Sequence, residues 1–142
     1  MGTVTIKLPP APDQVRTARL LAVTVARRAG VHESLVDEIR LAIGEACGRA
    51  VHAHVDRGVP GPITVRLTDD EGFEAVVVDL ASRPEPHRAV RRLPSLGVGC
   101  GGQDAAAIGL SILGAVVDDV TIEPVAPIGT CVRMRWPAAG AR

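Results

Sequence analysis

Aromatic side chains are nearly absent from this chain of 142 residues, which has no Tyr and only Phe73 and Trp136 as its Phe and Trp. Few rings are therefore available to stack on nucleotide bases. The 16 basic and 16 acidic residues cancel to a formal net charge of zero, so the overall attraction that drives nucleic-acid binding is also missing. We expect no direct binding to nucleic acid and a core built from aliphatic residues.

Paired cysteines and long apolar runs are lacking as well. Cys47, Cys100 and Cys131 are far apart and form no CxxC pair, so neither a disulfide framework nor a zinc site is indicated, and no metal ligands are expected. The N-terminal segment MGTVTIKLPP has no signal-peptide core, and no run is long enough to span a membrane. These absences predict a soluble, cytoplasmic protein that does not insert into membranes.

The composition is otherwise that of a globular protein, with 46% hydrophobic and 23% charged residues. The length suits one domain over residues 1–142. Apolar periodicity and turn residues divide the chain into a short strand, two helices, a hairpin, a third helix and a second hairpin. The predicted ranges are 4–8, 13–29, 34–55, 62–68 with 73–80, 105–119 and 120–136.

This order of elements predicts one mostly antiparallel sheet with helices on one face, which is a two-layer α+β sandwich. Asp13 is expected to cap the first helix, and Gly30 is expected to end it. The N-terminal strand should lie at an edge of the sheet, where it could pair with a second copy in a homodimer.

A segment rich in Pro and Gly, residues 82–103, separates the first hairpin from the third helix. Loops of this length inside a compact domain are typically functional or disordered, and we interpret this one as lid-like. Its arginines outnumber its single acidic residue, Glu85. A solvated loop is one reading, and binding of an anionic partner by Arg88, Arg91 and Arg92 is the other.

The segment LAIGEACGRAVHAH, residues 41–54, places Glu45 and Arg49 one turn apart on a helix. Without any ligand, such a pair forms an exposed ion pair of about 0.2–0.5 kcal/mol. His52 and His54 do not have the i, i+4 spacing of a helical metal site, so they are expected to face solvent or a partner. Cys47 is expected to be a small core residue rather than a nucleophile.

Three segments together resemble the GHKL ATP-binding fold and, more narrowly, the RsbW-type anti-sigma factors, which are serine-protein kinases. DEIRLAIGEACGRAVHAH is similar to the family helix with its E-x-x-x-N box. EAVVVDLASRPEP stands in the place of the D-x-G-x-G strand end. The segment from Ala105 to Trp136 is similar to the G-x-G-L helix and terminal hairpin with its Gly-Thr pair. The resemblance spans nearly the whole chain.

The resemblance assigns roles to the first two segments. Glu45 matches the family's glutamate, which acts as a base or orients the attacking group. Arg49 stands where the family has the asparagine that ligates Mg²⁺, and a guanidinium has no lone pair for a metal. Asp79, or Leu80 in a register shifted by one, matches the aspartate that binds adenine. The glycines that follow in the family are absent here, and Pro84 removes a backbone donor.

In the third segment Gly109 and Leu110 match the family, whereas Ala107 replaces a glycine. Gly101 and Gly102, within the run GVGCGG, could form a phosphate nest before the helix. Thr130 belongs to the Gly-Thr pair. Gly109 has a simpler explanation in close packing of helix against sheet.

The resemblance therefore implies a bacterial regulator whose nucleotide site is eroded, so that ATP and Mg²⁺ are doubtful ligands. Its partners would be an alternative sigma factor and a STAS-domain anti-anti-sigma protein. Two other functions fit the same residues. One is an active ATP-dependent serine kinase in which Arg49 contacts phosphate, and the other is a structural dimerisation module.

Overall fold

The computed structural model describes residues 2–81, 113–114, 117–125 and 128–140. Two long helices lie in this part of the chain, α1 (Gln14–Arg28) and α2 (Val36–Arg57), with a short 3-10 helix η1 (Glu33–Leu35) between them. The strands are β1 (Thr3–Leu8), β2 (Ile63–Thr68), β3 (Phe73–Asp79), β4 (Asp119–Pro124) and β5 (Thr130–Trp136).

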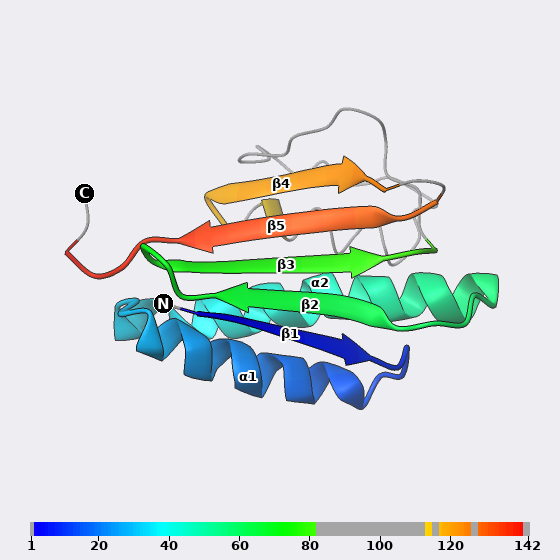
Figure 1. Ribbon diagram of the computed structural model, residues 1–142, viewed down its shortest axis with the longest axis horizontal. Helices are drawn as coiled ribbons and strands as arrows, with labels where there is room; N and C mark the ends of the chain where they lie inside the picture. Colours follow the sequence, from blue (N-terminus) through cyan, green and yellow to red (C-terminus); the bar gives the residue numbers. More distant parts are fainter. Residues whose placement is uncertain (1, 82–112, 115–116, 126–127, 141–142) are drawn as a thin grey trace.

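The five strands form one sheet in the order β1-β2-β3-β5-β4, and every neighbouring pair is antiparallel. Helices α1 and α2 lie side by side against one face of this sheet (Figure 1). The predicted two-layer α+β sandwich is therefore confirmed. Strand β1 lies at an edge of the sheet, as predicted. No helix within the described ranges is long and apolar enough to cross a membrane.

The core between helices and sheet is aliphatic, as the scarcity of aromatic residues requires. Alternate residues of the strands point inward and meet the apolar stripes of both helices. The only ring pair closes one end of this layer, where Phe73 stacks on Trp136 with 5.6 Å between ring centroids. The Trp136 indole Nε1 also donates to Glu38 of α2 at 2.7 Å, which ties the end of β5 to the helix layer.

The helix ends partly follow the predicted capping residues. Gly30 follows α1 with φ +83°, and Gly58 follows α2 with φ +64°, so both helices end at a residue suited to the left-handed conformation. Asp13 precedes α1 as predicted, but its side chain makes no capping hydrogen bond. The helical turn before α2 is instead capped by His32, whose Nδ1 accepts the Ser34 backbone N–H at 3.0 Å.

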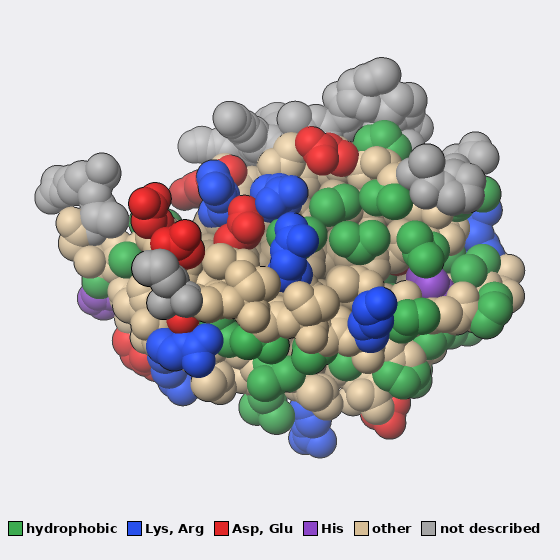
Figure 2. Space-filling model, viewed as in Figure 1, with side chains coloured by type: hydrophobic (Ala, Val, Ile, Leu, Met, Phe, Trp, Pro, Cys, Tyr) green, Lys and Arg blue, Asp and Glu red, His purple; other side chains and the backbone are tan. Residues whose placement is uncertain are grey.

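The uncovered face of the sheet is polar along its centre. Arg133 and Arg135 of β5 lie 3.2 and 3.3 Å from the Glu74 carboxylate of β3. Figure 2 shows this face, with Lys and Arg side chains beside acidic and apolar ones.

Most of the segment between β3 and β4 lies outside the described residues, and so do the predicted loop 82–103 and most of the predicted helix 105–119. Leu113 and Gly114 are helical, whereas Asp119, the last residue of the predicted helix, begins β4.

Candidate functional site

A buried ion pair joins the middle of α2 to the end of β3. Arg49 Nη2 lies 2.5 Å from Asp79 Oδ2, and the two side chains are 1% and 0% exposed. Ions removed from water in this way lose hydration free energy, which only a close partner and further hydrogen bonds can offset. The pair is therefore a fixed part of the interior.

The Asp79 carboxylate also organises the backbone that leaves β3. Its Oδ1 accepts the Ala81 backbone N–H at 2.9 Å, so both carboxylate oxygens have partners inside the protein. Leu80, the other position considered for the family aspartate, is 45% exposed. The side chain that faces Arg49 is thus that of Asp79.

The start of strand β5 places the Gly-Thr pair, Gly129 and Thr130, beside the end of β3. Thr130 is fully buried and lies opposite Asp79 in the register of β3 with β5. A Cβ atom at Gly129 would collide with the Asp79 carbonyl oxygen, so only glycine allows this close approach. Arg49, Asp79 and Thr130, each singled out in the sequence, are therefore gathered around the end of β3.

His54 is a buried member of this region that the sequence analysis placed wrongly at the surface. It is 1% exposed, and its Nε2 accepts the Leu80 backbone N–H at 3.1 Å. Because Nε2 accepts, the ring is neutral and Nδ1 donates to the Val59 carbonyl at 3.1 Å. The imidazole thus holds the residue after Asp79 against the end of α2. The signal was present in the sequence, since His54 continues the apolar stripe one turn after Ala50.

Glu45 lies one turn before Arg49 and is partly buried. The sequence allowed an ion pair between the two, but the ion pair of Arg49 is with Asp79, and no residue in the described ranges forms an ion pair with Glu45. The interpretation of Glu45 and Arg49 as an ion pair was wrong. Asp79, which is 30 residues away in the sequence, is a buried partner for the guanidinium, and an ion pair with an exposed helical neighbour would contribute little by comparison.

Two other titratable side chains of α2, Cys47 and His52, differ in their exposure to solvent. Cys47 is buried, as expected, and burial raises the pKa of its thiol to about 12, so it is protonated and a poor nucleophile near neutral pH. His52 is exposed. No cluster of three His, Cys, Asp or Glu side chains suited to a metal occurs within the described ranges.

Several predicted site residues cannot be placed in this geometry. Those expected to contact phosphate or a protein partner lie outside the described residues: Gly101, Gly102, Gly109, Leu110, Arg88, Arg91 and Arg92.

The model of one protein family, the histidine kinase-like ATPase domain, matches residues 8–136. The chain belongs to this histidine kinase-like ATPase domain family. The resemblance to the GHKL fold is thereby confirmed. No curated protein matches the chain.

A solved structure of the RsbU and RsbW domains of Rv1364c from Mycobacterium tuberculosis is similar in fold to this family member. The TM-score is 0.63 at 22% sequence identity, over 97% of this chain. The match covers 33% of the other chain, so this ATPase-like domain spans about a third of that protein's solved length.

ATP with Mg²⁺ is the ligand implied for a histidine kinase-like ATPase domain, and the described residues do not fit it in the family manner. Arg49 cannot ligate a metal, because a guanidinium has only donors. The Asp79 carboxylate, which would have to accept a hydrogen bond from adenine, already has an internal partner on each oxygen, Arg49 on Oδ2 and the Ala81 N–H on Oδ1. An internal cation thus takes the place at which the resemblance puts a ligand.

Proposed function

We propose that this histidine kinase-like ATPase domain is a regulator that acts by binding other proteins, and that its nucleotide site is closed from within. The observation that carries the proposal is the buried Arg49–Asp79 ion pair. The resemblance to RsbW-type anti-sigma factors suggests the partners, an alternative sigma factor and a STAS-domain anti-anti-sigma protein. The fold likeness to a chain that contains an RsbW domain supports that choice.

The loss of nucleotide affinity caused by the Arg49–Asp79 ion pair can be estimated. A nucleotide that took Asp79 from Arg49 would leave a buried guanidinium without its carboxylate, a change that costs roughly 3–5 kcal/mol in buried pairs. This corresponds to a loss of affinity of roughly 10²–10³-fold or more. Binding of Mg-ATP should therefore be very weak even if the rest of the site were intact.

Calorimetric titration with Mg-ATP and Mg-ADP tests the closed site. We expect no heat of binding at nucleotide concentrations that saturate an ordinary ATPase domain. A dissociation constant in the low micromolar range for either nucleotide would contradict the proposal.

Pairwise co-expression with the sigma factors and STAS-domain proteins of the same genome tests the partners. We expect one sigma factor or one STAS protein to co-purify in a stable complex, and Mg-ATP should leave the complex unchanged. Failure of every pair to form a complex would refute the choice of partners and would favour the dimerisation module, in which β1 pairs with the β1 of a second copy.

The predicted loop 82–103, which contains Arg88, Arg91 and Arg92, is proposed as part of the partner surface on the basis of its sequence alone. Replacing Arg88, Arg91 and Arg92 by Ala should weaken association and reduce its salt dependence, because fewer charges remain to attract an acidic partner. The melting temperature should stay almost unchanged. Unchanged affinity, or a clear loss of thermal stability, would argue against this role. Arg66→Ala on the uncovered face of the sheet serves as the control.

An ATP-dependent serine kinase remains the second candidate, and Glu45 favours it. This carboxylate is partly buried beside Arg49 and forms no ion pair within the described residues, as a base available for a substrate would require. Transfer of radiolabelled phosphate from ATP to the STAS protein, lost in Glu45→Gln, would establish this activity. No transfer in the wild type would exclude it.

A further inference from the structure

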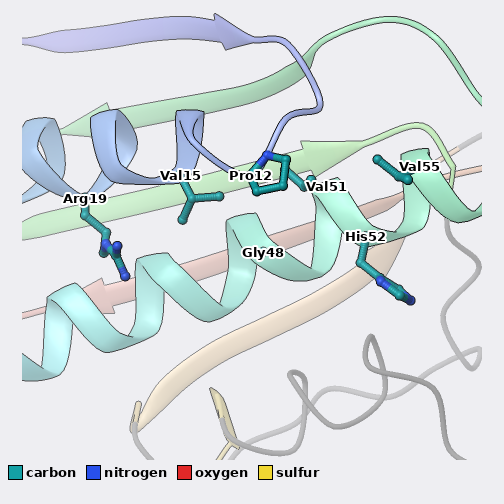
Figure 3. A pocket seen from close by; sticks show the side chains of 7 residues that line it. All are labelled: Pro12, Val15, Arg19, Gly48, Val51, His52 and Val55. Atoms are coloured by element: carbon teal, nitrogen blue, oxygen red, sulfur yellow. The ribbon is translucent and has the colours of Figure 1, made fainter.

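A hollow lies between α1 and α2 on the side away from the sheet, and its volume is about 430 Å³. Figure 3 shows it from the helix side, with Val15 and Arg19 on α1 facing Gly48, Val51 and Val55 on α2. We call it the helix groove. Its walls are aliphatic, and Arg19 and His52 are its charged and titratable side chains.

The groove owes its depth to a glycine that packing in the described structure does not require. A Cβ atom added at Gly48 would meet no atom within 4 Å, although glycine in a helix interior lowers helix stability relative to Ala. Gly44, one turn earlier, differs, since a Cβ there would lie 3.1 Å from Arg19 Nη1. Gly44 makes room for a side chain of the protein itself, whereas Gly48 leaves its space open.

Two aliphatic side chains of α2, at the groove and on the same helix stripe, are exposed to solvent. Val55 is 62% exposed at the end of the groove, and Leu41, on the same stripe of α2, is 46% exposed. Leu41 does not line the groove, but with Val55 it extends the aliphatic surface of α2 that is open to solvent, and such surfaces are sites at which proteins bind one another.

The charges around the groove select the kind of partner. Helix α1 contains four arginines and no acidic residue. Arg27 and Arg28, far from the groove along α1, pair with Glu33 and Asp69. Arg19 lines the groove, and Arg16 is exposed one turn before it on α1; neither has a carboxylate partner within the described ranges. The apolar hollow is therefore lined by one guanidinium group that could pair with an acid, that of Arg19, and a second arginine lies one turn away on the same helix.

We propose that the helix groove binds an amphipathic helix of a partner protein, with an aliphatic side chain seated over Gly48 and acidic side chains paired with Arg16 and Arg19. A groove between two packed helices is shaped for a third helix, whose apolar residues enter it at i, i+3 and i+4 spacing. This surface deepens the proposed protein-binding function, and the nucleotide site takes no part in it.

Selection from a random peptide library tests the groove without any assumed partner. Peptides of roughly 15 residues, about four helical turns, are displayed and selected on the immobilised full chain. We expect enrichment of aliphatic residues at helical spacing together with Asp or Glu. No enrichment over an uncoated support, or enriched peptides without acids, would overturn the proposal.

Variants then locate the bound peptides. Gly48→Leu fills the groove and should raise the dissociation constant of an enriched peptide at least about tenfold, which is what exclusion of one buried aliphatic side chain costs. Thr17→Leu adds the same side chain at an exposed position of α1 outside the groove and should have no effect. Equal binding to wild type and Gly48→Leu would overturn the proposal.

Neutral substitutions test the role of Arg19 in the same way. Arg19→Ser should weaken the peptide and flatten its salt dependence, whereas Arg66→Ser, on the opposite face of the sheet, should leave both unchanged. Gly48→Ala, whose melting temperature should not fall, replaces Gly48→Leu if the larger side chain disturbs folding. Absence of a sigma or STAS complex would refute only the partners proposed above, because the selection uses peptides alone.

Discussion

At the scale of single residues, one substitution relative to the family pattern changes what the neighbouring aspartate can do. An asparagine at position 49 would leave Asp79 to find its partner in a ligand, whereas Arg49 supplies that partner from within the chain. Because both groups are buried, neither can turn to water when the other is removed. The two residues therefore have to be understood as one unit.

A double-mutant cycle measures this unit. Asp79→Asn should lower the free energy of unfolding by about 3–5 kcal/mol, because it takes the carboxylate away from the buried Arg49 guanidinium. The double variant Arg49→Met/Asp79→Asn removes both charges, keeps an acceptor for the Ala81 N–H and should recover much of that loss. Urea denaturation of the wild type, the single variants Arg49→Met and Asp79→Asn, and the double variant gives the coupling. Losses that simply add would show that the pair is not coupled.

The sequence identified the members of this unit but not their contact. Arg49, Asp79 and Thr130 were each placed in one site by the family resemblance, and the structure brings them together. The ion pair itself could not be predicted, since it joins residues 30 positions apart through the packing of α2 on β3. His54 was misjudged for the same reason, because a buried polar ring is acceptable only when tertiary partners satisfy it.

At the scale of elements, prediction succeeded where the signal is local. The strand predicted over 4–8 is Thr3–Leu8 and that over 73–80 is Phe73–Asp79, because alternation of apolar residues needs no knowledge of the partner strand. The α1–α2 contact is less local. Nothing in the sequence distinguishes Gly44 from Gly48. In the structure, Gly44 lies against the Arg19 side chain, whereas a Cβ atom at Gly48 would meet no atom within 4 Å.

These two glycines give a matched prediction. Gly48→Ala should raise the free energy of unfolding by about 0.8–1 kcal/mol, the usual difference in helix propensity, since its Cβ meets nothing. Gly44→Ala should gain less, because Arg19 has to move away from a Cβ at 3.1 Å. Chemical denaturation of both variants checks the order. An equal gain in the two would show that Arg19 does not rest on Gly44.

The edge strand β1 is held by a carboxylate whose pKa is lowered. Asp69, just after β2, accepts the Gly2 backbone N–H and pairs with Arg28 at 2.7 Å; the first contact contributes most to holding the pKa of Asp69 below its ordinary 3.8. A lowered pKa in the folded state means that the stabilisation is present above pH 3.8 and is lost as the pH falls through the folded value.

Asp69→Asn should therefore be less stable than the wild type near neutral pH, and the difference should disappear in strong acid, where Asp69 is protonated in both states. Thermal melts across the acidic range measure this convergence. Asp70→Asn, at an exposed neighbour with no ion pair among the described residues, is the control. A constant difference at every pH would mean that Asp69 acts through packing rather than charge.

At the scale of the whole molecule, α2 separates two surfaces with opposite character. Toward β3 it carries buried polar side chains that contact the protein itself, with Arg49 on Asp79 and His54 on Leu80. Toward α1 and solvent it leaves the helix groove open over Gly48. The proposed protein-binding function rests on this contrast between an internal ion pair on one side of α2 and an open apolar groove on the other.

The proposed closure of the nucleotide site can be tested by asking whether one substitution, Arg49→Asn, restores binding of Mg-ATP. Arg49→Asn removes the internal cation together with its ion pair to Asp79, and it supplies an amide oxygen that can ligate Mg²⁺. We still expect weak binding of Mg-ATP by calorimetry, because Ala81 stands at the first glycine position of the D-x-G-x-G segment, where glycine would let the backbone approach the base, and Ala81 is fully buried.

The double variant Arg49→Asn/Ala81→Gly should therefore bind Mg-ATP more tightly than Arg49→Asn, and adding Asp79→Asn to either should abolish whatever binding has appeared, since the adenine acceptor would then be altered. Thermal shifts with and without Mg-ATP follow the same order through linkage between binding and stability. Recovery of a low-micromolar dissociation constant by Arg49→Asn alone would show that the guanidinium is the whole block. The strand end after Asp79 would then be compatible with a bound nucleotide, and the loss of family glycines would carry no functional meaning.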